Sequence, residues 1–90
     1  MVDVHGCGGE LKTGGRLAAS LGTWELRPQD GGCRISAALV ERDEFWLDEG
    51  GTFTLTLSWG TREKRWRNAT LLAIQGNSVA IQTKEWKSDG

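Results

Sequence analysis

The sequence predicts an all-β fold, a small antiparallel barrel or roll of five or six strands. Ninety residues suit one domain with a single hydrophobic core. Short runs rich in tryptophan and β-branched residues follow one another between turn signals, a pattern typical of strands. Closing so short a sheet into a barrel removes its exposed edges.

The first 22 residues are predicted to form an irregular arm outside the barrel. They hold six of the 13 glycines and show little periodicity. Within them, residues 16–21 fit either one helical turn or a short strand. Such an arm would wrap its own domain or reach a neighbouring molecule, which leaves the barrel to residues 23–90.

Two strands are predicted after the arm. The first covers residues 23–27 and ends at Pro28, and an Asp-Gly-Gly turn signal at 30–32 separates it from the second, at 33–40.

The segment 36–47 fits two structures. It reads as a helix that begins at Ser36 and stops before Gly50, which would add one short helix to the fold. We favour two strands that meet around 41–44.

The clearest strand covers residues 52–59. Four apolar side chains alternate there with four hydroxylated ones, so one face of the strand is buried and the other is polar. The apolar set is Phe53, Leu55, Leu57 and Trp59.

Two hairpins extend this strand. A glycine-containing turn at 76–77 fixes the register of one of them, and a turn at 61–62 fixes the register of the other. The first pairs Ile74 with Val79, Leu72 with Ile81 and Thr70 with Thr83, and the second pairs Leu57 with Trp66, Leu55 with Asn68 and Phe53 with Thr70.

Both registers place Trp66, Thr70, Leu72 and Ile74 on the core face. The result is a three-stranded meander over 52–86, in a barrel of SH3-like or OB-like size. On its outer face Ala73 lies beside Ala80, Leu71 beside Gln82, Ala69 beside Lys84, and Arg67 over Trp86 as a cation–π pair.

Charge is nearly balanced overall but not along the chain. Residues 41–50 hold five acids and one base, whereas residues 61–67 hold four bases and one acid. Both clusters fit solvated loops at hairpin ends, or complementary surfaces of successive copies that meet head to tail. The candidate interaction residues are Arg62, Lys64, Arg65, Arg67, Trp86, Trp46, Glu41, Asp43 and Glu44.

No catalytic, cofactor or metal site is predicted. His5, Cys7 and Cys33 supply three zinc ligands where a structural site needs four. One histidine and no tyrosine leave no set of nucleophile, base and orienting group, so we expect a protein that is not an enzyme. Without an export signal, both cysteines are expected as free thiols.

The predicted function is a structural or interaction module. Five tryptophans exceed what so small a core encloses, and tryptophan is a favoured interface anchor, so we expect a homo-oligomer or larger assembly. In general build the chain resembles small bacteriophage virion proteins of the neck, tail or capsid decoration. We expect synthesis in the cytoplasm, incorporation into a virion and no membrane contact.

The alternative is a nucleic-acid-binding barrel that uses the basic, tryptophan-containing strand 62–67. A pI of about 5.8 argues against a polyanion partner.

Overall fold

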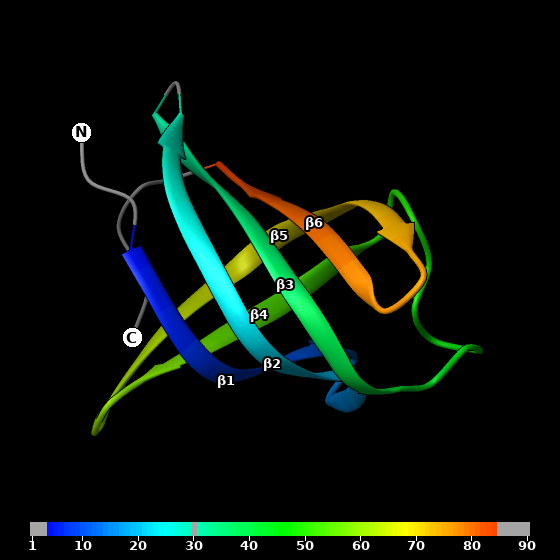
Figure 1. The fold of residues 1–90 in the computed structure, drawn as a ribbon. Coiled ribbons are helices and arrows are strands. Elements are labelled where there is room, and N and C mark those ends of the chain that lie inside the picture. Colours follow the sequence, from blue (N-terminus) through cyan, green and yellow to red (C-terminus); the bar gives the residue numbers. More distant parts are fainter. Residues whose placement is uncertain (1–3, 30, 85–90) are drawn as a thin grey trace.

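The computed structural model describes residues 4–29 and 31–84, which form six strands in one closed barrel (Figure 1). The strands are β1 (Val4–Thr13), β2 (Arg16–Gln29), β3 (Gly32–Arg42), β4 (Thr52–Trp59), β5 (Arg62–Gln75) and β6 (Ser78–Thr83). Their order around the barrel is β1-β2-β3-β6-β5-β4, and every neighbouring pair is antiparallel. The prediction of a small all-β barrel is confirmed.

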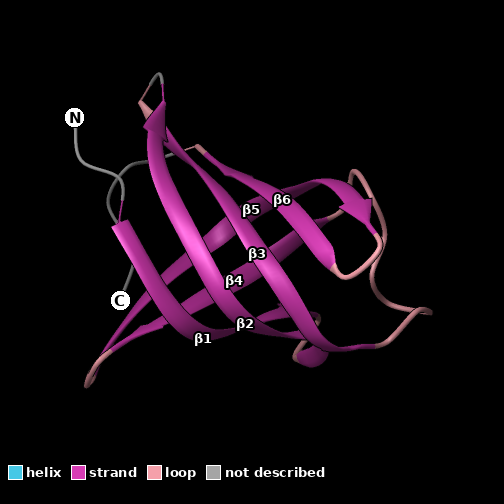
Figure 2. Cartoon of the chain, viewed as in Figure 1, coloured by secondary structure: helices cyan, strands magenta, loops and turns pink. Residues whose placement is uncertain are grey.

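The fold consists of two meanders, β1–β2–β3 and β4–β5–β6, joined by the loop 43–51 (Figure 2). Pairing of β1 with β4 and of β3 with β6 closes the barrel. Each strand contributes to the core one side chain that is at most 2% exposed to solvent: Leu11, Leu26, Ile35, Leu55, Leu71 and Ile81. No helix in the described part of the chain is long and apolar enough to cross a membrane.

The prediction of an irregular arm is wrong for residues 4–22. They form β1 and the first half of β2, and residues 9–12 of β1 pair with β4 to close the barrel. Glycine suits β1 at Gly6 and Gly9, because neither position has room for a side chain. A Cβ on Gly6 would overlap the Trp24 ring, and one on Gly9 would lie 2.6 Å from the backbone oxygen of Thr56.

The β5–β6 hairpin begins as predicted and then changes register. Ile74 pairs with Val79 across the turn, and Ala73 pairs with Ala80. A bulge between Leu71 and Ala73 then brings Leu71 opposite Ile81 and leaves Leu72 40% exposed. The predicted core position of Leu72 is therefore wrong, because one extra residue in a strand reverses every face beyond it.

The β4–β5 hairpin turns one residue earlier than predicted, at 60–61, where Gly60 has a φ of 65°. Leu55 therefore pairs with Trp66 and Leu57 with Lys64. Shifting the pairing by two residues preserves the faces, so Trp66 is buried as predicted.

A bulge between Phe53 and Leu55 changes the rest of this hairpin. Phe53 pairs with Ala69, and Asn68 is exposed, so the predicted pair of Leu55 with Asn68 does not form. Because of the earlier β4–β5 turn and the bulge in the β5–β6 hairpin, the predicted pairs Thr70–Thr83, Leu71–Gln82 and Phe53–Thr70 do not form. The predicted partner of Arg67, Trp86, lies outside the described residues.

The ambiguous segment 36–47 contains no helix. Strand β3 continues to Arg42 as part of the barrel wall, and no second strand follows it before β4. A single turn follows instead, in which the N–H of Phe45 donates to Oδ1 of Asp43 at 3.0 Å and the N–H of Leu47 donates to the Asp43 carbonyl at 3.0 Å. This turn carries Leu47 into the core, where it is 5% exposed.

Candidate functional site

The predicted interaction residues that the structure describes separate into two groups at opposite ends of the barrel. We call one the acidic end: the turn 14–15, the loop 43–51, the turn 76–77 and the strand residues next to them. The basic end comprises the β2–β3 turn, the turn 60–61, the start of β1, the end of β6 and the strand residues near them. The loop 43–51 and the tip of the β4–β5 hairpin lie on opposite sides of Figure 1.

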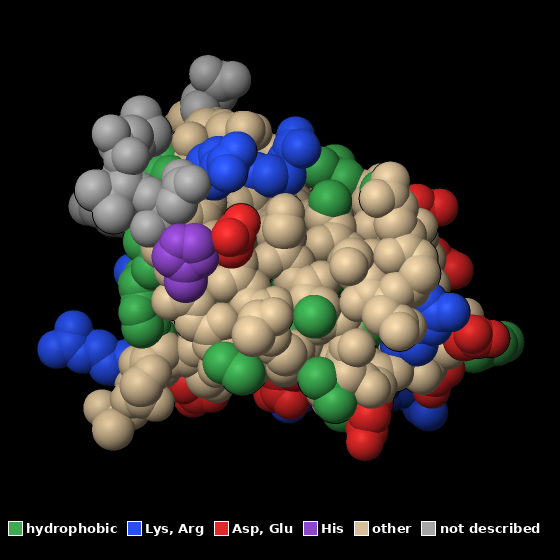
Figure 3. Space-filling view, in the orientation of Figure 1, with side chains coloured by type: hydrophobic (Ala, Val, Ile, Leu, Met, Phe, Trp, Pro, Cys, Tyr) green, Lys and Arg blue, Asp and Glu red, His purple; other side chains and the backbone are tan. Residues whose placement is uncertain are grey.

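The two ends carry opposite charge among the described residues. In Figure 3 the right side and lower edge carry most of the visible Asp and Glu, with a few Lys and Arg among them, whereas the upper centre and far left carry mainly Lys and Arg. The acidic end has Glu41, Asp43, Glu44, Asp48 and Glu49 against Arg16 and Arg42. The basic end has Arg27, Arg34, Arg62, Lys64, Arg65, Arg67 and Lys84 against Glu25 and Glu63.

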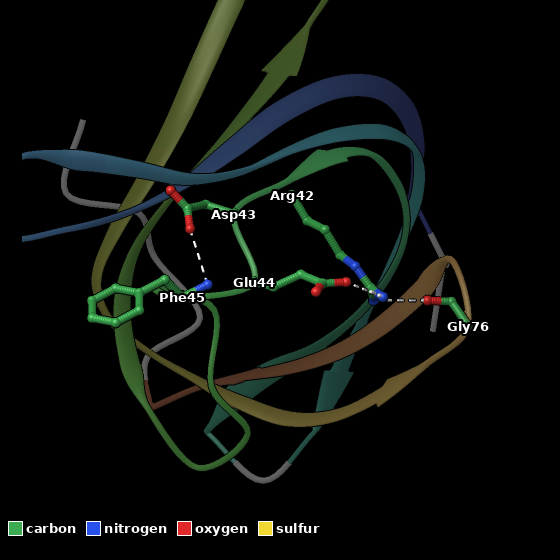
Figure 4. A network of polar contacts seen from close by, with 5 residues as sticks. All are labelled: Arg42, Asp43, Glu44, Phe45 and Gly76. Carbon is green, nitrogen blue, oxygen red and sulfur yellow. Dashed lines mark hydrogen bonds and ion pairs between the residues drawn. The ribbon is translucent and has the colours of Figure 1, made fainter.

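At the acidic end, a polar network fixes the loop 43–51 against the neighbouring turn (Figure 4). Arg42 donates from Nη1 to the Gly76 carbonyl and from Nη2 to Oε1 of Glu44, both at 3.2 Å. Asp43 caps the local turn through its carboxylate. Asp43 and Glu44, both predicted as interaction residues, therefore also shape the loop, whereas Glu41 is simply exposed.

The loop also presents aromatic side chains. Phe45 is 77% exposed, and its ring points away from the polar network. It contacts the half-buried Trp46 edge-on, with ring centroids 5.0 Å apart, and Arg16 lies over Trp46 at 5.0 Å. Three more exposed apolar side chains lie within three residues of this end of their strands: Leu17, Val40 and Leu72.

At the basic end, Lys64 and two tryptophans pack against one another. Lys64 Nζ lies 4.7 Å above the Trp59 ring, which meets Trp24 edge-on at 5.3 Å. Trp59, Arg62 and Lys64 line a hollow of about 320 Å³. Arg65 and Arg67 are exposed further along β5.

The sequence pattern did not single out Phe45 and Trp59. Phe45 is an aromatic residue inside an acidic run, which is a detectable signal. Trp59 was assigned only to the core face of its strand, and its place at the basic end follows from the position of the turn at 60–61.

The cysteines are not bonded to each other: Cys7 is exposed and Cys33 is buried. Burial raises the pKa of the Cys33 thiol, and a hydrogen bond to Thr83 and the charge of Lys64 offset part of the rise. We expect a thiol reagent such as 5,5′-dithiobis(2-nitrobenzoate) to modify Cys7 rapidly and Cys33 only when the barrel opens.

A Cys7→Ser variant isolates the slow thiol, and added denaturant should accelerate its reaction. Equal rates for both thiols in the folded protein would contradict the burial of Cys33. Because the Cys33 pKa is raised by folding, its contribution to stability should be lost as the pH rises through the alkaline range.

No three His, Cys, Asp or Glu side chains within residues 4–29 and 31–84 are grouped as metal ligands. His5 Nδ1 instead lies 3.4 Å from the carboxylate of Glu25, with both side chains more than half exposed. No family model matches this chain, and no curated protein or solved structure matches it either.

Proposed function

We propose that this protein is a structural module that assembles with copies of itself, the acidic end of one copy against the basic end of the next. The observation that carries the proposal is the separation of opposite charges onto opposite ends of one rigid barrel, with an exposed aromatic residue at the acidic end. Opposite charges at the two ends attract in this orientation and repel when like ends meet.

Such a contact joins two different surfaces of the same molecule. Successive copies therefore form a ring if the rotation between them closes, and an open filament if it does not. Exposed charges attract weakly in salt, so they steer and orient the contact, while apolar side chains supply affinity. Phe45 is suited to that role because aromatic anchors dominate many interfaces.

The proposed role is non-enzymatic. His5 and Glu25 form the imidazole–carboxylate contact, but both lie in water, without the enclosed, preorganised surroundings of an acid–base site. A module that stacks end to end also suits the virion neck, tail or capsid decoration, which remains a prediction from the build of the chain.

The nucleic-acid alternative loses part of its support. Trp66, the aromatic residue within the basic strand, is 4% exposed and has no face left for a base. Trp59 is half-buried beneath Lys64. Oligonucleotide binding by a monomeric chain is therefore a result that would contradict the proposal.

The test is a pair of charge-reversed variants. Glu41→Lys with Asp48→Lys reverses the net charge of the acidic end, and Arg62→Glu with Arg65→Glu removes most of the net positive charge of the basic end. All four side chains are exposed, and none has a polar contact with another described residue, so the fold should survive. We expect each variant alone to self-associate at least about tenfold more weakly than the natural chain. In an equimolar mixture, the intact acidic end of one variant should bind the intact basic end of the other and form a heterodimer.

Light scattering at several protein and salt concentrations measures these outcomes. Glu10→Lys with Lys12→Glu serves as the control, because these two side chains contact each other at 3.5 Å between the ends and the exchange keeps the net charge. The proposal fails if the mixture stays monomeric. It also fails if a monomeric natural chain binds a labelled oligonucleotide and loses that binding in the Arg62/Arg65 variant.

A further inference from the structure

Phe45 is the most exposed large apolar side chain in the described part of the chain, at 77%. Its own loop fixes its position. The N–H of Phe45 donates to Oδ1 of Asp43 at 3.0 Å, and its ring meets Trp46 edge-on with the centroids 5.0 Å apart. Figure 4 shows the ring pointing away from the polar network of the loop. A side chain that is fixed before it binds loses little freedom when a partner covers it.

Two acids, Asp43 and Glu44, directly precede this aromatic residue. The side chain of Glu44 is 80% exposed, and its ion pair with Arg42 at 3.2 Å leaves it at the surface beside Phe45. A phenyl ring next to a carboxylate is complementary to a surface that combines an aromatic ring with positive charge.

A surface of that kind lies at the basic end, in the hollow of about 320 Å³ lined by Trp59, Arg62 and Lys64. The ring of Trp59 supplies apolar surface, and its edge-on contact with Trp24 at 5.3 Å holds it in place. Lys64 Nζ lies 4.7 Å from the centroid of the Trp59 ring. The aliphatic stems of Arg62 and Lys64 add apolar surface while their charged groups stay in water.

Phe45 and this hollow are too far apart to meet within one molecule. The loop 43–51 and the tip of the β4–β5 hairpin lie on opposite sides of the barrel (Figure 1). Another molecule must therefore supply the side chain that fills the hollow. Charge favours a second copy of this chain, because an acid stands beside Phe45 and two cations line the hollow.

We propose that Phe45 of one copy inserts into the hollow lined by Trp59, Arg62 and Lys64 of the next copy. This inference rests on the proposed self-assembly, and it names the side chains that hold the two ends together. The phenyl ring packs against the apolar surface of the hollow, and Glu44 faces the two cations. An aromatic side chain that fills a pocket of the partner contributes more affinity than the exposed charges around it.

The two charge-altered variants isolate one such contact. In their mixture, the acidic end of the Arg62→Glu/Arg65→Glu variant binds the basic end of the Glu41→Lys/Asp48→Lys variant. Adding Phe45→Ala to the first variant should weaken the heterodimer at least about tenfold in a calorimetric titration. Adding Phe45→Ala to the second variant should leave its affinity nearly unchanged, because there the residue lies at the end that is not in contact.

Val40→Ala in the first variant is the matched control. Val40 is an exposed apolar side chain at the same end, and we expect its removal to change the affinity by less than about threefold. If the heterodimer forms equally tightly after Phe45→Ala in the first variant, or weakens equally with Phe45→Ala in either variant, this inference is overturned while the head-to-tail contact stands. If the unaltered pair of variants forms no heterodimer, both proposals are overturned.

A disulfide between copies tests the place where the ring binds. With Cys7→Ser in both chains, we combine Phe45→Cys in the first variant with Arg62→Cys in the second and oxidise the mixture with diamide. A disulfide-linked heterodimer is expected on a non-reducing gel, because the two cysteines would approach within bonding distance. Glu10→Cys, which lies between the two ends, replaces Phe45→Cys as the control. A yield no higher than that of the control would place Phe45 outside the hollow and overturn the inference.

Discussion

Gly6→Ala is expected to lower the free energy of unfolding by about 3 kcal/mol, although the change adds only one methyl group. Glycine-to-alanine changes in extended backbone ordinarily stabilise a protein slightly, because alanine has fewer unfolded conformations to lose. Here the new Cβ would overlap Cζ2 of Trp24 and lie 2.6 Å from its Cε2. The effect therefore has the opposite sign to the usual one.

Trp24 has no easy way to move aside. Its Nε1 donates to the Gly8 carbonyl at 3.0 Å, and its ring packs edge-on against Trp59. The side chain is 2% exposed, so a shift of the ring would disturb the packing at the basic end.

Thermal or denaturant unfolding followed by circular dichroism measures the loss. Gly22→Ala is the control, because its nearest side-chain neighbour is the exposed Val40, which can give way, and we expect a change within about 0.5 kcal/mol. Adding Trp24→Leu to Gly6→Ala should cost less than the sum of the two single changes. If the losses of unfolding free energy in the two single variants added up in the double variant, the Trp24 ring would not be what the new methyl group meets.

Leu47→Ala should destabilise the barrel by about 3 kcal/mol, whereas Phe45→Ala should leave its stability unchanged. Leu47 is 5% exposed and closes the acidic end of the core, while Phe45, two residues earlier, is 77% exposed. Removing a buried side chain costs its burial and leaves a cavity.

The variants Leu47→Ala and Phe45→Ala also distinguish an effect on folding from an effect on assembly. We expect Phe45→Ala to weaken self-association measured by light scattering, with an unchanged unfolding midpoint. A Phe45→Ala variant that unfolds more readily would mean that the ring packs on its own barrel. A Phe45→Ala variant that assembles normally would show that Phe45 is not part of the interface.

The pattern of the sequence predicted the parts of this fold that depend on neighbouring residues. Alternation along 52–59 identified β4, and glycine at 76 placed the β5–β6 turn, because side-chain periodicity and positive φ angles are local properties. Both properties can be recognised within a few residues.

The errors arose where distant residues decide the structure. A glycine-rich segment has low strand propensity by itself, and β1 forms because its inward glycines accommodate side chains from β2 and β4. The bulges near Leu72 and Thr54 likewise have no turn signal, since they adjust the strands to the curvature of a closed barrel. Each bulge changes which side chains face the core, so the faces predicted for the residues beyond it were wrong.

The same reasoning applies to the candidate sites. The acidic and basic runs could be located in the sequence, but their placement at opposite ends required the strand order. The hollow lined by Trp59, Arg62 and Lys64 likewise depends on the turn at 60–61, which the sequence pattern placed one residue too late.

The division of the barrel into two meanders has a consequence for how the chain folds. Within each meander every strand pairs with its neighbour in the sequence, and only the β1–β4 and β3–β6 pairings join distant segments. Local pairs form with little loss of chain entropy, so we expect docking of the two halves to be the slow step. Until it occurs, four strand edges are open to other chains, and the interval before closure is when this protein is most exposed to aggregation.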